Sequence, residues 1–161
     1  MDSTIAAWLP LGLLESLSAT PWGPFVLPVL IAILTAGFTG FSVPGMLAPV
    51  SFISGLLLGI GGILAVALGV LVGSHVLFLA SRRWLAASMQ ARFGERLSGV
   101  SDHLGRKGPI YVVLARLTGV PHVVVTAGCA ATPITARAFL TASLLGMLPA
   151  ITLAHLAGQA I

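Results

Sequence analysis

A stretch of 66 residues, from Ser16 to Ser81, contains no Asp, Glu, Lys or Arg. Folded as helix, this stretch would extend on the order of 100 Å, which is about three crossings of a lipid bilayer. The composition agrees, because 7% of the 161 residues are charged, whereas a soluble domain has roughly a quarter. Residues 60–80 are apolar on every side, which does not fit the alternating pattern of a β-barrel strand. The sequence therefore predicts an all-α integral membrane protein, with residues 1–161 in a single membrane domain.

The excess positive charge of the chain lies in one segment, residues 82–107. Six of the eight Lys and Arg residues fall there against two acidic residues, and this difference equals the formal net charge of +4. By the positive-inside rule we expect a cytoplasmic loop. The alternation of charged and apolar residues from Trp84 to Leu104 predicts an amphipathic helix on the membrane surface, and a merely solvated loop would give the same topology. In a membrane protein, charge placed in this way does not indicate nucleic acid binding.

Residues 1–21 contain no Lys or Arg, so they lack the positive start of a secretory signal and also its small-residue cleavage site. We expect mature protein there, in an interfacial segment with Trp8 and Trp22 at headgroup depth. The first half of the membrane domain would then cover residues 22–81, and the second half residues 108–161.

Proline and glycine divide the first half, because proline lacks a backbone donor and clashes with the preceding helical turn. The expected order is a first span at 24–40, a break at 41–45, a broken segment of about 18 residues ending near residue 59, and an uninterrupted span at 61–80 before the interfacial residues Arg82 and Arg83.

The second half shows a similar pattern. Residues 108–117 are apolar but too short to span, a break follows at 118–122, and a second short apolar run covers 123–131. Two half-length helices that meet at a break predict a re-entrant hairpin. A last helix is expected from about Ala136, capped by Thr135 and long enough to cross the bilayer.

Matching residues recur in the two halves. They are Val43-Pro44 and Val120-Pro121 at the breaks, and two glycine pairs that are each 18 residues apart, Gly55 with Gly73 and Gly128 with Gly146. We therefore predict an inverted repeat of two re-entrant helical hairpins, each followed by a transmembrane helix, together with an N-terminal span. Pro44 and the four glycines are expected to be structural, because glycines allow helices to approach closely. Whether the first break is a hairpin or a kinked span stays open.

Arg116 is the strongest candidate for a functional residue. It lies five residues before Pro121 within an apolar segment, where a cation costs about 2.5 to 3.5 kcal/mol even on lenient insertion scales. No acidic residue lies in either apolar half, so its remaining partners are carbonyls, water or an anionic ligand such as a phosphate. The alternative is that Arg116 snorkels to the cytoplasmic interface.

Other ionisable residues are weaker candidates. His122 follows the second break and could donate to the same anion or titrate, whereas Arg137 lies at the start of the last helix, where snorkelling is easy. His75 and His155 lie within spans and are functional candidates by position alone. Each of them has a structural alternative, in which its local surroundings satisfy the side chain.

Enzymes find little support in the sequence. It has no H-E-x-x-H, no G-x-S-x-G, no Gly-Lys-Ser/Thr phosphate loop and no paired carboxylates. Its single cysteine, Cys129, cannot form an intramolecular disulfide, and no spacing of metal ligands is present. We expect no enzymatic activity, no cofactor and no bound metal.

Several short motifs of the second half occur in one combination. They are R-L-T-G-V-P-H at 116–122, Ala127-Gly128, Arg137-Ala138-Phe139 and L-L-G-M-L-P at 144–149. This combination resembles the DedA family, also called the VTT or SNARE-associated domain. The first half agrees through Val43-Pro44, Ser54-Gly55 and a Gly-rich span that ends in Arg82-Arg83. The resemblance covers about residues 38–158.

The resemblance implies two re-entrant hairpins, each followed by a membrane helix, and the movement of lipids: undecaprenyl phosphate in bacteria, phospholipids in eukaryotic relatives. The family's arginine before the second break falls on Arg116, and a second arginine of many bacterial members falls on His122. Gly119 stands where the family usually has proline, with Pro121 instead. The acidic residues that many bacterial members carry around the first hairpin are absent, which argues against proton coupling.

Together these observations predict a lipid transporter, a flippase or scramblase, in the inner membrane of a bacterium. Its partners would be membrane lipids, and an undecaprenyl phosphate or phospholipid headgroup would be bound by Arg116, His122, Arg137, Gly119 and Pro121. One alternative is an ion- or proton-coupled exchanger of small solutes, and another is an assembly or scaffold protein whose Gly-rich helices bind partners. Several lipids, either direction of movement and more than one energy source are compatible with the sequence. A homo-oligomer is one option for the oligomeric state.

Overall fold

The computed structural model describes residues 16, 19–85, 87–88, 91 and 107–160, and within this part of the chain all regular structure is helical. The helices are α2 (Gly23–Gly40), α3 (Leu47–Leu58), α4 (Gly61–Trp84), α6 (His122–Ala130) and α7 (Ala136–Gln159), and residues 107–117 form a further helix. The predicted N-terminal interfacial segment and most of the predicted amphipathic helix lie outside the described residues.

Three of the described helices, α2, α4 and α7, are long and apolar enough to cross a membrane, which confirms the helical membrane class. α4 and α7 contain 24 residues each, or about 36 Å at 1.5 Å per residue, and this exceeds the roughly 30 Å of a hydrocarbon core. The start of α7 is the one expected, because the Thr135 hydroxyl accepts a 3.3 Å bond from Ala138 N and caps the helix.

The segment between α2 and α4 differs from the expected broken segment. It is a single 12-residue helix, α3, with Pro49 in its first turn. The first backbone N–H groups of a helix have no intrahelical acceptor, so proline removes no bond there and α3 continues past Pro49. Each half of the chain therefore has a first helix, a short helix and a 24-residue helix: α2, α3 and α4, then the 107–117 helix, α6 and α7.

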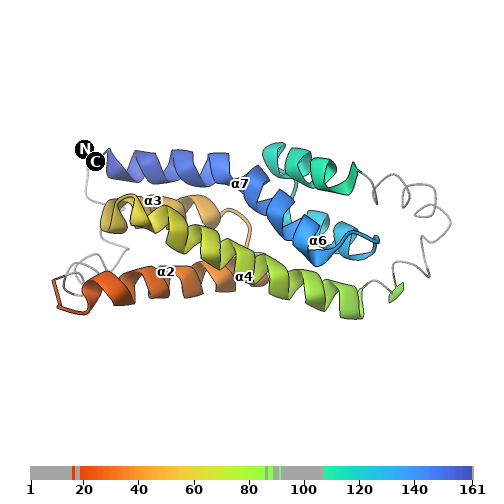
Figure 1. Ribbon diagram of the computed structural model, residues 1–161, viewed down its shortest axis with the longest axis horizontal. Helices are drawn as coiled ribbons and strands as arrows, with labels where there is room; N and C mark the ends of the chain where they lie inside the picture. Colours follow the sequence, from red (N-terminus) through yellow and green to blue (C-terminus); the bar gives the residue numbers. More distant parts are fainter. Residues whose placement is uncertain (1–15, 17–18, 86, 89–90, 92–106, 161) are drawn as a thin grey trace.

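Figure 1 shows α4 and α7 running along the length of the molecule in opposite directions. α2 and α3 lie along one half of this length, and the 107–117 helix and α6 lie along the other half. The break after α2 and the break after the 107–117 helix are consequently both near the middle. Residues of the two breaks line one cavity together.

The two breaks have the same backbone structure. The hydrogen bonds are Val43 N to Phe38 O (2.9 Å) and Ser42 N to Thr39 O (3.1 Å) at the first break, and Val120 N to Ala115 O (3.1 Å) and Gly119 N to Arg116 O (3.4 Å) at the second. Each pair forms a Schellman motif, whose residue beyond the helix has a positive φ. This φ is 55° at Ser42 and 77° at Gly119. The residues at and after this turn are Val-Pro both times, and proline disfavours any continuation of the helix.

Glycines let the long helices approach the first helix of each half. A Cβ on Gly73 of α4 would collide with Thr39 of α2, and a Cβ on Gly146 of α7 would lie 2.6 Å from Cβ of Arg116. Thr39 and Arg116 hold the same place in their Schellman motifs, so the two glycines make corresponding contacts. Gly128 differs, because a Cβ there would have no atom within 4 Å.

Gly55 allows a close contact between α3 and α7, because a Cβ there would collide with the carbonyl of His155. The His155 side chain is fully buried. Its Nδ1 lies 3.0 Å from Ser54 Oγ, and its Nε2 lies 2.7 Å from the carbonyl oxygen of Gly59. His155 therefore joins α7 to α3 and to the turn before α4, which is a structural role. His75 is different, because its Nδ1 atom is buried without a partner.

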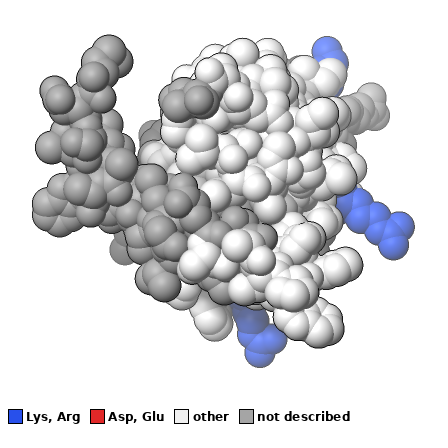
Figure 2. Space-filling view, turned by 90° about the vertical axis from the view of Figure 1, so that its left-hand side faces the viewer, with Lys and Arg blue, Asp and Glu red and all other residues white. Residues whose placement is uncertain are grey.

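Apart from Arg116, the described basic residues gather at one end of the molecule. Arg82 and Arg83 lie in the last turn of α4, Lys107 starts the 107–117 helix, and Arg137 is the second residue of α7. Figure 2 faces the opposite end, where α7 finishes, and shows Lys and Arg only at the outline behind it. The described part of the chain has no acidic residue, so its charge is positive and lies mainly at one end.

Candidate functional site

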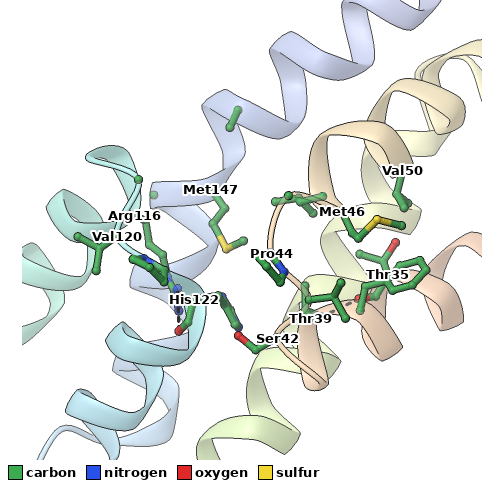
Figure 3. Close-up of a pocket in the computed structure, with 18 residues that line it drawn as sticks. Thr35, Thr39, Ser42, Pro44, Met46, Val50, Arg116, Val120, His122 and Met147 are labelled. Carbon is green, nitrogen blue, oxygen red and sulfur yellow. Dashed lines mark hydrogen bonds between the residues drawn. The ribbon is translucent and has the colours of Figure 1, made fainter.

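A cavity of about 360 Å³ lies between the two breaks, a size that falls in the range of small-molecule sites. Figure 3 shows Arg116 and His122 on one side of it and Ser42, Thr39 and Pro44 on the other. The lining residues are Thr35, Phe38, Thr39, Ser42, Val43, Pro44, Gly45, Met46, Leu47 and Val50 from the first half, Arg116, Gly119, Val120, Pro121 and His122 from the second break, and Gly146, Met147 and Ala150 from α7.

The guanidinium of Arg116 turns toward α6 and α7. It donates to the carbonyl oxygen of His122 (3.3 Å), to Thr126 Oγ1 (3.1 Å) and to Ser143 Oγ (3.3 Å). All three acceptors are neutral, and the Nε atom of Arg116 is buried without a partner. The cation therefore has hydrogen bonds but no counter-charge among the described residues.

Thr126 and Ser143 were not candidates from the sequence, although both are buried and orient Arg116. Thr126 lies one turn after His122 and donates to its carbonyl at 2.8 Å. Ser143 lies about one turn before Gly146, so both residues face the 107–117 helix from α7. A small hydroxyl one turn from a glycine at a helix contact is the sequence signal that could have found Ser143.

The structure places the predicted site residues in two groups. Gly119, Pro121 and His122 line the cavity together with Arg116. Both ring nitrogens of His122 are buried without a partner, which leaves them available to a ligand. Arg137 is exposed at the start of α7 and is not among the lining residues.

The first half supplies an uncharged wall. The Thr35 hydroxyl donates to Ile31 O and the Thr39 hydroxyl to Thr35 O, both at 2.7 Å, so these donors are used within α2. Arg116 and His122 are consequently the two ionisable side chains of the lining. The site is suited to an anion bound from one side, with an apolar and hydroxyl-bearing surface opposite.

The comparisons with known proteins agree with this geometry. The family model described as VTT domain matches residues 28–160. The chain belongs to the VTT-domain family. The matched residues include both breaks and every residue that lines the cavity, and the predicted resemblance to DedA proteins is confirmed. Neither a curated protein nor a solved structure matches the chain. VTT-domain proteins are in general membrane transporter-type proteins rather than enzymes.

A second guanidinium of the VTT domain, that of Arg82, holds the end of α6 and the turn that leads to α7. Arg82, predicted as an interfacial stop, donates through Nε to Ala130 O (3.3 Å) and through Nη2 to Thr132 O (2.8 Å) and Ile134 O (2.7 Å). These carbonyls lie at the end of α6 and in the turn before α7. Carbonyls at a helix end lack intrahelical donors, so Arg82 of α4 acts as a side-chain cap on α6 and its following turn.

Two buried aromatic rings connect the two guanidiniums of the VTT domain. The guanidinium carbon of Arg82 lies 4.6 Å from the centroid of Phe78, Phe78 stacks on Phe139 at 4.6 Å, and the guanidinium carbon of Arg116 lies 5.8 Å from the centroid of Phe139. Cation–π contacts of this kind contribute about 0.5 to 2 kcal/mol. The stack therefore helps to hold Arg116 in one orientation at the wall of the cavity.

The chemistry that the site offers is the binding of an anion. Among the described residues no group of three or more His, Cys, Asp or Glu is placed to hold a metal ion. The guanidinium of Arg116, fixed by neutral acceptors and lining a cavity, can give charge-assisted hydrogen bonds to a phosphate.

Proposed function

We propose that this VTT-domain protein is a lipid transporter that moves a lipid with an anionic phosphate headgroup across the membrane. The headgroup enters the cavity between the breaks and is bound by Arg116 with help from His122, while the hydrocarbon tail stays at the bilayer side. Undecaprenyl phosphate or a phospholipid fits this chemistry. The observation that carries the proposal is a guanidinium at the wall of a cavity amid apolar helices, with no counter-charge among the residues that the structure describes.

Energetics support an anionic ligand. A cation within the hydrocarbon region costs about 2.5 to 3.5 kcal/mol on insertion scales. The carbonyl and hydroxyl acceptors of Arg116 reduce this cost without neutralising the charge. A bound phosphate would neutralise it and could accept from the unpartnered Nε, and a charge-assisted bond of this kind is worth about 1.5 to 3 kcal/mol.

We infer that the protein enters the membrane as two re-entrant hairpins related by an inverted repeat. The second is made of the 107–117 helix with α6. The first is made of α2 with α3, so that α2, expected from the sequence as a separate N-terminal span and long enough to cross, is an arm of the first hairpin in this proposal. Three features support this: the shared Schellman motif, the corresponding contacts of Gly73 and Gly146, and the opposite directions of α4 and α7. Non-helical backbone at membrane depth is tolerated where it lines protein or water, as both breaks do at the cavity.

We infer the orientation from the charge. Because Arg82, Arg83, Lys107 and Arg137 lie at the ends of elements that meet at one end of the molecule, the positive-inside rule favours a cytoplasmic position for that end. The proposed location is the inner membrane of a bacterium, where a polyprenyl phosphate carrier would be available.

Reconstitution of the full chain into vesicles tests the proposal. A fluorescent lipid phosphate is added, and its protection from external dithionite reports movement between leaflets. We expect Arg116→Ala to slow movement at least about tenfold, because one charge-assisted hydrogen bond is worth about that factor. Arg116→Lys keeps the charge without the planar fork and should be intermediate.

Arg137→Ala is the matched control, because Arg137 is exposed and does not line the cavity. It should transport at the wild-type rate. Equal rates for Arg116→Ala and the wild-type protein would defeat the mechanism. A loss in Arg137→Ala alone would place the anion at the end of the molecule and not in the cavity.

A further inference from the structure

A second cavity, of about 310 Å³, lies between the two arms of the second hairpin. We name it the hairpin groove, and its lining residues are Tyr111, Val112, Ala115, Val120, Val124, Val125, Gly128, Cys129 and Thr132. Most of them are apolar. The Thr132 hydroxyl donates to the carbonyl of Cys129 at 2.8 Å, so it presents no free donor to a ligand. The lining suits hydrocarbon and not a headgroup.

The hairpin groove adjoins the cavity of Arg116. Val120 lines both, and Ala115 of the groove precedes Arg116 directly in the chain. The two cavities therefore meet at Val120, and a lipid whose phosphate contacts Arg116 would have to lay its tail across Val120 to reach the groove. One cavity has a charged wall and the other is apolar, which matches the charged headgroup and the hydrocarbon tail of a lipid.

Gly128 keeps the hairpin groove open. It lies inside α6, where its φ is not positive, so the backbone does not require glycine. A Cβ at this place would meet nothing within 4 Å, so helix packing does not require glycine either. Glycine weakens a helix relative to alanine. The remaining physical consequence of Gly128 is the space beside it, and that space is the groove.

We propose that the hairpin groove binds one hydrocarbon chain of the lipid whose phosphate is bound by Arg116. This inference depends on the proposed function for the phosphate, and it adds a binding site for the tail. The ligand class is a long-chain lipid phosphate. A short-chain phosphate would occupy the Arg116 cavity alone and gain nothing from the groove.

Photocrosslinking tests the proposal. The full chain in phosphatidylcholine nanodiscs is given a long-chain alkyl phosphate with a diazirine in its chain, and adducts are located by mass spectrometry. We expect adducts at Val124, Gly128 and Cys129 of the groove. Arg116→Gln should reduce them at least about tenfold, because it removes a charge-assisted contact to the phosphate.

A second experiment fills the groove with a larger side chain. Gly128→Phe should abolish the groove adducts, while a short-chain alkyl phosphate, measured by calorimetry, binds as it does to the wild-type protein. Gly37→Phe is the matched control, because Gly37 also has open space around its Cβ position and lines neither cavity. Gly128→Leu repeats the experiment with a smaller side chain if the Phe variant does not fold.

The outcomes distinguish a hydrocarbon chain whose phosphate is bound by Arg116 from a chain that enters the groove directly from the bilayer. Groove adducts that persist in Arg116→Gln would show that the probe's chain enters the groove from the bilayer without its phosphate being bound by Arg116, and they would overturn the proposal. So would adducts confined to other residues, or adducts unchanged by Gly128→Phe. Arg116-dependent groove adducts without vesicle transport would support the groove and contradict the transport function. Transport by the wild-type protein without groove adducts would support the transport function and contradict the groove proposal.

Discussion

The two breaks share a backbone structure and differ in the side chain at one corresponding position. At the first break this side chain is Thr39, whose hydroxyl bonds to the carbonyl of Thr35 in its own helix. At the second break it is Arg116, whose guanidinium reaches two further segments of the chain. Each of these residues packs against a glycine of the following long helix, Gly73 or Gly146. The same scaffold thus occurs twice, and the charge occurs once.

The comparison shows that the backbone motif forms the turn in both halves, whereas the side chain at the corresponding position determines whether the turn carries a charge. A Schellman motif with Val-Pro ends a helix near the middle of the molecule in both halves, with Thr39 at the corresponding position in one and Arg116 in the other. The first half is closed by small neutral side chains, and the second half is held by two guanidiniums. If the halves are related as proposed, the first provides a wall and the second provides the charge.

The largest effect is expected at the glycine contacts. Gly73→Ala should destabilise the protein by about 3 kcal/mol or more, because its Cβ collides with the backbone of α2 as well as with Thr39, and overpacking of this severity lies at the upper end of measured costs. Gly146→Ala should cost less, about 1 to 3 kcal/mol, because its contacts are longer. Unfolding in mixed detergent micelles measures both. A cost at one position only would show that the two contacts do not correspond.

Much of this fold could be predicted from the sequence. The apolar stretches and the clusters of proline and glycine predicted α2, α4 and α7 and both breaks, because a bilayer requires apolar helices and such clusters interrupt them, although α7 continues through the single proline Pro149. Pro49 shows the limit, since it was read as part of a broken segment. The effect of a proline depends on its distance from the helix start, and that start became visible only in the structure.

The candidate site was less predictable than the fold. Arg116 could be selected because an intramembrane cation is unusual by itself. The capping role of Arg82 could not, because its acceptors are backbone carbonyls 48 to 52 residues away, and a carbonyl acceptor leaves no trace in residue identity. The wall formed by Thr39 and Ser42 was missed for a related reason, since it depends on how the two halves meet.

An intermediate effect is expected at Arg82, which tests whether the second half depends on its guanidiniums. Arg82→Ala removes the donor from three carbonyls near the end of α6, and we expect a loss of about 2 to 3 kcal/mol. Arg82→Lys should recover part of it. Arg83→Ala, at the exposed neighbour, should stay within about 0.5 kcal/mol of the wild-type protein. Equal losses for Arg82→Ala and Arg83→Ala would indicate a general effect of charge and no specific cap.

The smallest effect tests the shared motif itself, because its left-handed residue is serine in one half and glycine in the other. A side chain at positive φ costs about 1 to 2 kcal/mol. Gly119→Ala should therefore destabilise by about 1 kcal/mol, and no clash contributes, since nothing lies within 4 Å of its Cβ position. Ser42→Gly should stabilise by about 0.5 to 1 kcal/mol, the relief of strain being partly offset by the freedom of glycine in the unfolded chain. Gly37→Ala, in a helical position with equal space, should stabilise because alanine favours helix by about 0.5 to 1 kcal/mol. Chemical unfolding in micelles measures all three. Both breaks need a residue with positive φ, so the change in unfolding free energy should be stabilising for Ser42→Gly and destabilising for Gly119→Ala. Changes of the same sign would mean that the two breaks share their hydrogen bonds but not their energetics.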